Sequence, residues 1–428
     1  MKQARLTERL QARKILFSFK GTCYKLEVFM QIHEKKLEAV LSYPFHQQYS
    51  INEILFFDIE TTGLSSKMSY LYLIGCVYFK EGVPHLIQWF ADGIEDEKEL
   101  LHQFFSFMEN YKVLIHYNGS GFDIPYLQAK CKRYLLNYSF DTITSIDIYK
   151  ELLPLKKILP TENLKQRSVE EFIGIHREDV FTGGDLIGVY GQYVGIKRYE
   201  TLSANNSKYN VKQDSGLPSA ATSSSDALLY VLLLHNAEDL QGLLKISSML
   251  AYRDIAHGQI SYTSYIQDKD NLSLLFELKT SLPQPMNISK TLSLGDFEQI
   301  NTHDYIVYCS IEGTQGRVTI PYYYGVMKHY FANYKDYYYL PMEDTAIHKS
   351  VAEYVEKEYR KKATKETCYV KKEGLFLPQI DMTFTPEFQF GPKDKLSWFD
   401  PTVLTNSTEL KNELSNYLYQ MLTFILSK

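Results

Sequence analysis

Two carboxylates stand two residues apart, Asp58 and Glu60, in the stretch FFDIETTGL from Phe56 to Leu64. An apolar run precedes them and predicts a buried strand over residues 54–61, on which side chains two apart face the same way. Such carboxylates repel each other and lose their hydration unless a cation lies between them. A hard divalent ion bound by oxygens satisfies both groups. Taken alone, the pattern also fits an edge strand with a solvated acidic face.

A second acidic position follows the strand predicted at 113–118. The sequence NGSGFDIP places Asn118 at the end of this strand and Asp123 at the start of a helix, with Pro125 in the first turn, where its missing N–H does no harm. An Asp at a helix start is often only a cap. Because sites in α/β sheets are built at strand ends, a role in a site stays open for Asp123 and, more weakly, for Asp147 in the next predicted strand.

A third position lies in an apolar helix predicted over residues 226–250, which carries His235 and Asp239. Residues four apart lie on one face of a helix. A lone His on a buried face is more often a hydrogen-bonded core residue than a functional one. A His with an Asp at this spacing, in a chain that already carries DIE and FD, predicts a site.

The elements around these residues are those of a mixed sheet with flanking helices. After the first strand we expect a hairpin around the KEGVP turn, a helix over 96–111, the strand at 113–118 and a helix over 122–136. This order is the one found in ribonuclease-H-like folds. A further strand near 145–149 and helices near 168–173 and 184–193 follow, and the serine-rich segment 203–225 predicts a flexible surface insertion before the last helix.

Bulk composition predicts a soluble chain of two or three domains. The chain has 428 residues, of which 45% are apolar and 23% charged. No apolar run is long enough to span a membrane, so we expect a cytoplasmic protein. Five scattered cysteines without a CxxC pair argue against a disulfide framework and a zinc site. With a net charge of −5, any basic nucleic-acid site must be local.

We place the domain boundaries at residues 50 and 250. Residues 1–50 form a basic N-terminal extension with short strands, 51–250 hold the ribonuclease-H-like domain, and 251–428 form a separate α+β domain with helices expected at 344–362 and 408–426. Nine of the 21 residues in 321–341 are Tyr or Phe, with Lys328, His329 and Lys335 among them. This stretch fits single-strand recognition. A tyrosine-rich sheet or a surface for a protein partner fits it somewhat better, and both interpretations stay open.

The three acidic positions together resemble the DEDD 3′-to-5′ exonucleases, in the subgroup whose last motif is His-x-x-x-Asp. The stretches DIETTGL, YNGSGFDIPYL, LKQRSVEEFIGIHREDVFTGG and LLHNAEDLQGLL are similar to the ribonuclease-H-like exonucleases typified by bacterial YprB, over roughly residues 50–250. The resemblance implies a phosphodiester hydrolase that acts on DNA or RNA, with single-stranded 3′ ends as its partner. It does not cover the carboxyl-terminal third, and the insertion at 203–225 is longer than the pattern expects.

The resemblance also implies roles for individual residues. Two Mg²⁺ or Mn²⁺ ions would be held by four carboxylates, and a histidine would be the general base; these residues are Asp58, Glu60, Asp123, Asp239 and His235. Thr61, Thr62 and Gly63 would lie where the terminal nucleotide binds, and Asn118 would lie beside the scissile phosphate. The alternative is a ribonuclease-H-like binding or scaffold protein without turnover, whose carboxyl-terminal domain contacts a protein partner.

Overall fold

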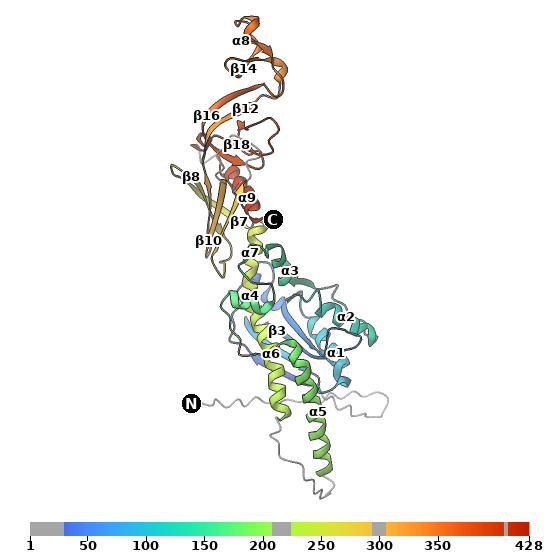
Figure 1. Ribbon diagram of the computed structural model, residues 1–428. Helices are drawn as coiled ribbons and strands as arrows, with labels where there is room; N and C mark the ends of the chain where they lie inside the picture. The colour runs from blue at the N-terminus through green and yellow to red at the C-terminus, as the bar shows by residue number, and fades with distance from the viewer. Residues whose placement is uncertain (1–29, 208–223, 293–304, 406–409, 428) are drawn as a thin grey trace. The chain divides into compact units, whose positions relative to one another are not determined.

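The computed structural model describes residues 30–207, 224–292, 305–405 and 410–427. The chain divides into two compact units, Met1–Leu250 and Ala251–Lys428, hereafter unit 1 and unit 2. In Figure 1 unit 1 runs from blue to yellow-green, and unit 2 continues from yellow to red. None of the helices in the described part of the chain is long and apolar enough to cross a membrane.

Unit 1 is built on a six-stranded mixed sheet in the order β1-β4-β3-β2-β5-β6. Strands β1 to β4 are joined by antiparallel pairs, whereas β5 and β6 run parallel to β2. The strands are β1 Gln31–Lys36, β2 Ile54–Thr61, β3 Leu71–Lys80, β4 Val83–Phe90, β5 Val113–His116 and β6 Thr144–Asp147. This arrangement confirms the mixed ribonuclease-H-like sheet expected from the order of the predicted strands.

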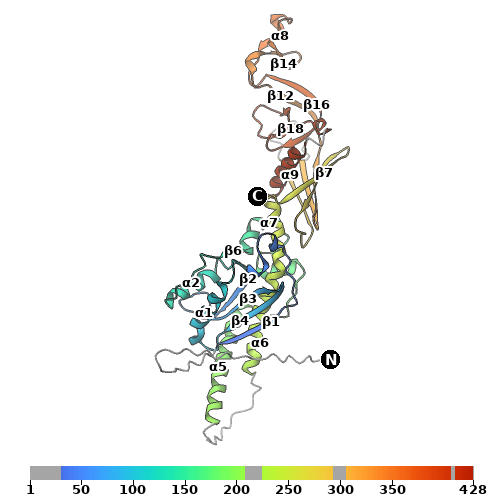
Figure 2. The same cartoon turned by 180° about the vertical axis from the view of Figure 1, so that it is seen from behind.

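Helices cover both faces of this sheet. They are α1 Glu97–Met108, α2 Asp123–Arg133, α3 Ile148–Leu152, α4 Gln166–Phe172, α5 Gly183–Ser207 and α6 Ser225–Ile246. Helix α6 crosses in front of the strands in Figure 1 and lies behind them in Figure 2, so it follows one face. Successive side chains of β2 point to opposite faces of the sheet. Phe57 stacks on Phe104 of α1, with ring centroids 5.6 Å apart, whereas its neighbour Asp58 accepts a hydrogen bond from α6.

A glycine in β3 allows α6 to approach the sheet closely. Gly75 pairs with Asp58 across the β2–β3 ladder. A Cβ atom at this position would lie 1.9 Å from Oδ1 of Asn236 and 2.6 Å from Leu240, both on α6. Any larger residue would therefore push α6 away from the strand that carries Asp58 and Glu60.

Two boundaries in unit 1 differ from the expectation. The sheet begins with β1 at Gln31, before residue 51, because this strand pairs with β4. Helix α5 continues to Ser207, so the first residues of the segment 203–225 are helical rather than a flexible insertion. The remainder of that segment, residues 208–223, and the basic pattern within residues 1–29 lie outside the described residues.

Unit 2 is dominated by antiparallel strands. One sheet has the order β7-β8-β11-β10-β9, a second β12-β16-β18-β17 and a third β14-β13-β15. The strands are β7 Ile260–Gln267, β8 Asn271–Leu278, β9 Met286–Leu292, β10 Tyr305–Glu312, β11 Gln315–Pro321, β12 Tyr323–Tyr330, β13 Tyr337–Leu340, β14 Thr345–His348, β15 Lys361–Lys362, β16 Tyr369–Gln379, β17 Glu387–Phe388 and β18 Ser397–Phe399. The helices are α7 Leu250–Ala256, α8 Lys349–Ala352 and α9 Lys411–Leu426. The last of these confirms the helix expected near the carboxyl end.

The helix expected over residues 344–362 is wrong. Strand β14 begins there at Thr345 and pairs with the tyrosine-rich β13, and only four residues, Lys349–Ala352, form α8. The apolar residues of this segment have helical spacing, but part of the segment forms a strand instead. Strand pairing is favoured because β13 is rich in tyrosines, and a helix here would leave the edge of β13 without a hydrogen-bonded partner.

Candidate metal centre

Strand β2 brings Asp58 and Glu60 to the face of the sheet that α6 covers. Glu60 is buried, and the strand register shifts immediately after it, between Glu60 and Thr61. Asp123 is the first residue of α2, and its Oδ1 accepts a hydrogen bond from the backbone N–H of Ile59 at 3.3 Å. The three carboxylates therefore meet around one peptide of β2, and the positive end of α2 lies beside them.

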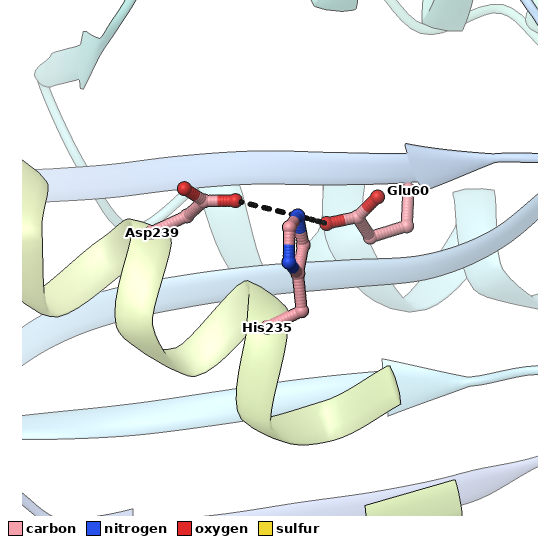
Figure 3. Close-up of side chains that lie close together, drawn as sticks. All are labelled: Glu60, His235 and Asp239. Carbon is pink, nitrogen blue, oxygen red and sulfur yellow. Dashed lines mark ion pairs between the residues drawn. The ribbon is translucent and has the colours of Figure 1, made fainter. Parts of the chain in front are cut away.

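Helix α6 supplies three side chains from one turn. Asn236 donates from Nδ2 to Oδ2 of Asp58 at 2.9 Å, and its own Oδ1 accepts from Gln88 at 2.9 Å. Figure 3 shows His235 between Asp239 and Glu60, with Nε2 at 3.3 Å from Oδ2 of Asp239 and 3.7 Å from Oε1 of Glu60. One ligand atom from each of Glu60, His235 and Asp239 lies within 4.8 Å of the others, a separation that one metal ion can bridge.

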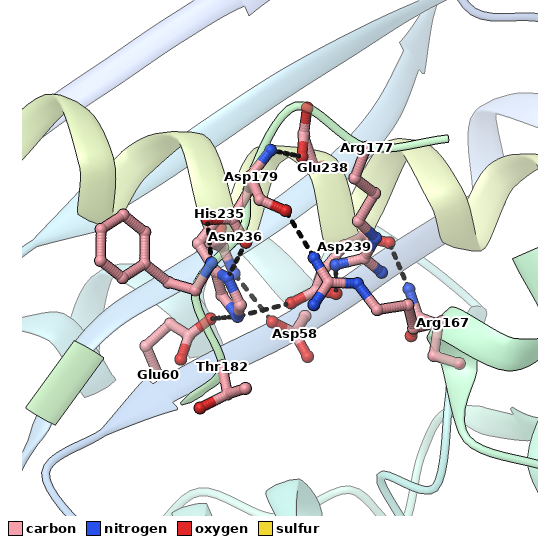
Figure 4. Close-up of polar contacts among 12 residues, drawn as sticks. Asp58, Glu60, Arg167, Arg177, Asp179, Thr182, His235, Asn236, Glu238 and Asp239 are labelled. Carbon is pink, nitrogen blue, oxygen red and sulfur yellow. Dashed lines mark hydrogen bonds and ion pairs between the residues drawn. The ribbon is translucent and has the colours of Figure 1, made fainter. Parts of the chain in front are cut away.

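The loop after α4 carries a partner for His235. Oδ2 of Asp179 lies 2.5 Å from Nδ1 of His235 (Figure 4). In the neutral imidazole this bond places the proton on Nδ1 and directs the lone pair of Nε2 toward Glu60 and Asp239. Glu238 of α6 in turn accepts hydrogen bonds from the backbone N–H groups of Glu178 and Asp179 at 3.0 and 2.9 Å, so the loop is fixed to the helix.

Arg177, on the same loop, pairs with two carboxylates. Its Nη1 lies 2.5 Å from Oδ1 of Asp239, and its Nε and Nη2 contact both oxygens of Glu170 at 2.5 and 2.7 Å. Glu170 is completely buried, and a Cβ atom at Gly242 of α6 would lie 1.9 Å from its Oε1. Arg177 thus fixes one oxygen of Asp239 and leaves the other facing His235 (Figure 4).

Three carboxylates of this centre, those of Asp58, Glu60 and Asp123, have raised pKa values because they are buried close to other acids. Burial raises the pKa of Asp58 and of Glu60 well above the ordinary value, and the charges of neighbouring acids, Asp239 first among them, raise both further. Burial also raises the pKa of Asp123 to about 7, although hydrogen bonds from backbone N–H groups oppose the shift. Divalent cations would relieve this repulsion, and clustered carboxylate oxygens are suitable ligands for a hard divalent ion.

The other predicted contact residues lie at the end of β2 and in the turns that follow β2 and β5. Thr61 donates from Oγ1 to the carbonyl of Gly63 at 2.9 Å, and Oγ1 of Thr62 accepts from the backbone N–H of Tyr70 at 2.8 Å. Asn118 is exposed at the turn after β5, with a φ of 57°. The structure therefore brings Asp58, Glu60, Asp123, His235 and Asp239 together. It places Thr61 at the end of β2, Thr62 and Gly63 in the turn after it, and Asn118 in the turn that precedes Asp123. Their roles remain predictions.

Asp147, the weaker candidate, holds the turn after β5 and the start of α3 by hydrogen bonds. Its carboxylate accepts hydrogen bonds from the backbone N–H of Asn118 at 2.8 Å and from Oγ of Ser120 at 2.5 Å. It also caps α3 through the N–H of Lys150. Asp147 therefore shapes the turn that leads to Asp123, and reaches the centre only through its charge, which raises the pKa of Asp123.

Sequence reasoning missed four side chains of this network: Arg177, Asp179, Asn236 and Glu238. Two of them, Arg177 and Asp179, stand in the stretch LKQRSVEEFIGIHREDVFTGG, which carried the resemblance without any assigned role. The other two lie between His235 and Asp239 on α6. A loop residue 56 positions away from its partner in the sequence has no periodicity that would reveal the contact.

Comparisons with known proteins give several similar solved structures and one family match. Among solved structures, the matches include the family B DNA polymerase of the archaeon Pyrobaculum calidifontis (15% identity, TM-score 0.32, 46% of this chain and 24% of that one). They also include Escherichia coli exonuclease I in complex with a dA16 oligonucleotide (8%, 0.24, 52% and 54%) and exonuclease I from Methylocaldum szegediense (11%, 0.25, 63% and 64%). This chain spans less than two thirds of each of these proteins. No curated protein matches it.

Residues 55–214 match the model of the RNase H superfamily, and with the order of the sheet this match identifies an RNase H-like domain in unit 1.

Proposed function

We propose that unit 1 is a metal-dependent exonuclease that hydrolyses phosphodiester bonds of DNA or RNA from the 3′ end, with two Mg²⁺ or Mn²⁺ ions. The observation that carries this proposal is the convergence of four carboxylates and one histidine from β2, α2 and α6. The family match ends at residue 214, before α6 begins at Ser225. The placement of His235 and Asp239 beside Glu60 is therefore support that the family match does not provide.

The carboxylates would hold the ions in a site that the fold has already shaped. Asp58, Glu60, Asp123 and Asp239 would hold the ions through their carboxylate oxygens. When bound, the ions would stabilise the charge on the attacking and leaving oxygens of an in-line displacement at phosphorus. Asn236 and Arg177 each fix one oxygen of a proposed ligand, Asp58 and Asp239, so few rotamers need to be restricted when an ion binds.

His235 would be the general base. Its Nε2 faces the carboxylates and would accept the proton of the attacking water, while Asp179 would stabilise the positive imidazolium that results. The variant His235→Gln tests this role. Mn²⁺ affinity close to that of the parent with a large fall in kcat is the expected result, whereas an equally large fall in Mn²⁺ affinity would instead make His235 a metal ligand.

The turn after β2 would receive the terminal nucleotide, and the structure holds it rigidly. Oγ of Ser69 donates to the carbonyl of Gly63 at 2.8 Å. Below the turn, Nζ of the fully buried Lys130 donates to the carbonyl of Ser69 at 2.5 Å and pairs with Oε1 of Glu97 at 2.7 Å. A rigid turn next to Glu60 would let the hydroxyl groups of Thr61 and Thr62 meet a terminal sugar without rearrangement.

Direction and substrate are tested with matched oligonucleotides. The purified chain is incubated with single-stranded DNA and RNA of one sequence, labelled at either the 3′ or the 5′ end, with Mg²⁺, Mn²⁺ or EDTA. We expect immediate loss of the 3′ label and a descending ladder from the 5′-labelled strand, with no cleavage in EDTA. Lack of degradation of both nucleic acids, or full activity in Asp58→Asn, would reject the proposal.

A further inference from the structure

Unit 2 contains a cavity of about 580 Å³ between residues 334 and 363, where β13, β14, β15 and α8 meet. We call it the tyrosine–lysine cavity. Three tyrosines and four Lys or Arg side chains line it, against a single acidic side chain, Glu353. Its volume is within the range of ordinary ligand sites. In a chain with a net charge of −5, this is a local excess of positive charge next to aromatic rings.

The register of the strands places an aromatic ring beside a cation. Strand β13 alternates, and its residues Tyr337 and Tyr339 pack against a small apolar cluster that includes Ala346 and Cys368. Tyr338, between them, faces the other way and pairs with Lys362 of β15. The guanidinium of Arg360 lies over the ring of Tyr338, 5.0 Å from its centroid, which adds positive charge beside this ring.

Two of the four cations are available to a ligand. Lys349 pairs with Asp336 at 2.6 Å, and Arg360 donates to the carbonyl of Ala352. Lys335 and Lys362 are exposed, and within the part of the chain that the structure describes no hydrogen bond or ion pair is found for the ammonium group of either. Their ammonium groups can therefore meet an external anion without breaking an internal contact.

We propose that the tyrosine–lysine cavity binds single-stranded nucleic acid, with a base stacked on Tyr338 and phosphates paired with Lys335 and Lys362. A single strand alternates flat rings with negative charges, which is the complement of tyrosines next to exposed lysines. A duplex hides the faces of its bases, and an acidic peptide has no rings to stack. Tyr354 and Tyr359, which are 90% and 52% exposed on the segment that leads from α8 to Arg360, offer rings for neighbouring bases. The proposal does not depend on hydrolysis in unit 1.

The test measures binding by the full chain in EDTA, in the Asp58→Asn background, so that neither metal binding nor cleavage contributes. The probe is a fluorescein-labelled strand of dT or rU, about 16 nucleotides long, followed by anisotropy. Lys335→Glu/Lys362→Glu is expected to raise Kd at least about 10-fold and to reduce the salt dependence of binding. Tyr338→Leu keeps the apolar bulk but removes the flat ring and is expected to raise Kd about 10-fold, whereas Tyr338→Phe stays near the parental value.

A matched control uses two lysines outside the cavity. Lys361 precedes Lys362 in β15, pairs with Tyr339 and does not line the cavity, and Lys279 is exposed directly after β8. The variant Lys279→Glu/Lys361→Glu makes the same change of charge and should bind almost as the parent does, and melting curves should show that all variants are folded. The proposal would be overturned if the cavity variant bound with parental affinity, or if the control variant bound as weakly as the cavity variant. It would also be overturned if the parent bound duplex DNA as tightly as the single strand, or if poly-glutamate competed as well as an unlabelled single strand. Failure of the parent to cleave with metal would affect only the function proposed for unit 1.

Discussion

The metal centre of unit 1 and the tyrosine–lysine cavity of unit 2 have opposite designs. In the metal centre, acids are buried in one place, and each of His235, Asp58 and Asp239 is fixed by another side chain, namely Asp179, Asn236 and Arg177. In the cavity, Lys335 and Lys362 are exposed and have no such fixing contact within the described residues. The buried acids of the first region would be stabilised by cations, whereas the exposed lysines of the second would be neutralised by an anion.

This difference separates catalytic positioning from binding. A catalytic constellation has to be held to within fractions of an ångström, so its charged groups must be buried and paired, at a cost to stability when ions are absent. A site that follows a flexible phosphate chain needs positive charge and flat rings but little rigidity. Substitutions in the metal centre should therefore change stability and metal binding together, whereas those in the cavity should change only affinity.

The sharpest test of this contrast is Asp58→Asn. We expect metal-dependent cleavage to fall about 1,000-fold or more, because a proposed metal ligand is lost. Without metal, the same variant should melt a few degrees higher than the parent, since one of several mutually repelling acids is gone. Asp141→Asn, at an exposed site in the same unit, should change neither property. Reduced thermal stability in EDTA would contradict the electrostatic account.

Arg177→Met tests the cost of a buried charge in the metal centre. The substitution leaves the fully buried Glu170 without its guanidinium partner, and we expect the free energy of unfolding to fall by about 3 kcal/mol. Adding Glu170→Gln should recover part of this loss. Arg198→Met, which removes an exposed arginine 4.0 Å from Glu95, should cost much less. Chemical denaturation of the four proteins measures the differences, and equal losses at Arg177 and Arg198 would contradict the prediction.

Asp179→Ala asks whether fixing contacts matter for chemistry as well as for stability. Loss of the partner of His235 should reduce activity about 10- to 100-fold. Asp179→Asn, whose amide oxygen can still accept the hydrogen bond from Nδ1, should lose less. Glu178→Ala removes an exposed neighbour that contributes only its backbone N–H to the loop and should be close to the parent. The kcat values of these three variants are measured at saturating Mn²⁺. Equal values for Asp179→Ala and Glu178→Ala would exclude a positioning role for Asp179.

The comparison also shows which features a sequence can reveal. The strands of the unit 1 sheet could be predicted because they are short apolar runs separated by turn sequences. The site could be predicted because the spacing of its residues in strands and helices places side chains on the same face; these residues are Asp58, Glu60, Asp123, His235 and Asp239. Asp179 could not be found in this way, because a loop has no period and its partner is 56 residues distant in the sequence. The segment 344–362 was mistaken for a helix because its apolar spacing is helical, whereas pairing with β13 decides its structure.

The mildest test changes only the pH. The pKa of Asp123 is raised by burial from 3.8 to about 7, so between these values the folded, metal-free protein binds more protons than the unfolded chain, and its stability falls as the pH rises. His116 acts in the opposite direction: burial lowers its pKa to about 4, so its contribution to stability grows as the pH rises toward 6.5.

A comparison of the parent with Asp123→Asn cancels the effect of His116. From pH 5 to 7 in EDTA, we expect the parent to lose about 1–2 kcal/mol relative to this variant, as measured by urea denaturation. Because Mn²⁺ would replace the bound protons, its addition should abolish the difference in the parent. A parent that gains stability relative to Asp123→Asn over this range would show that the carboxylates are not buried together as the structure places them.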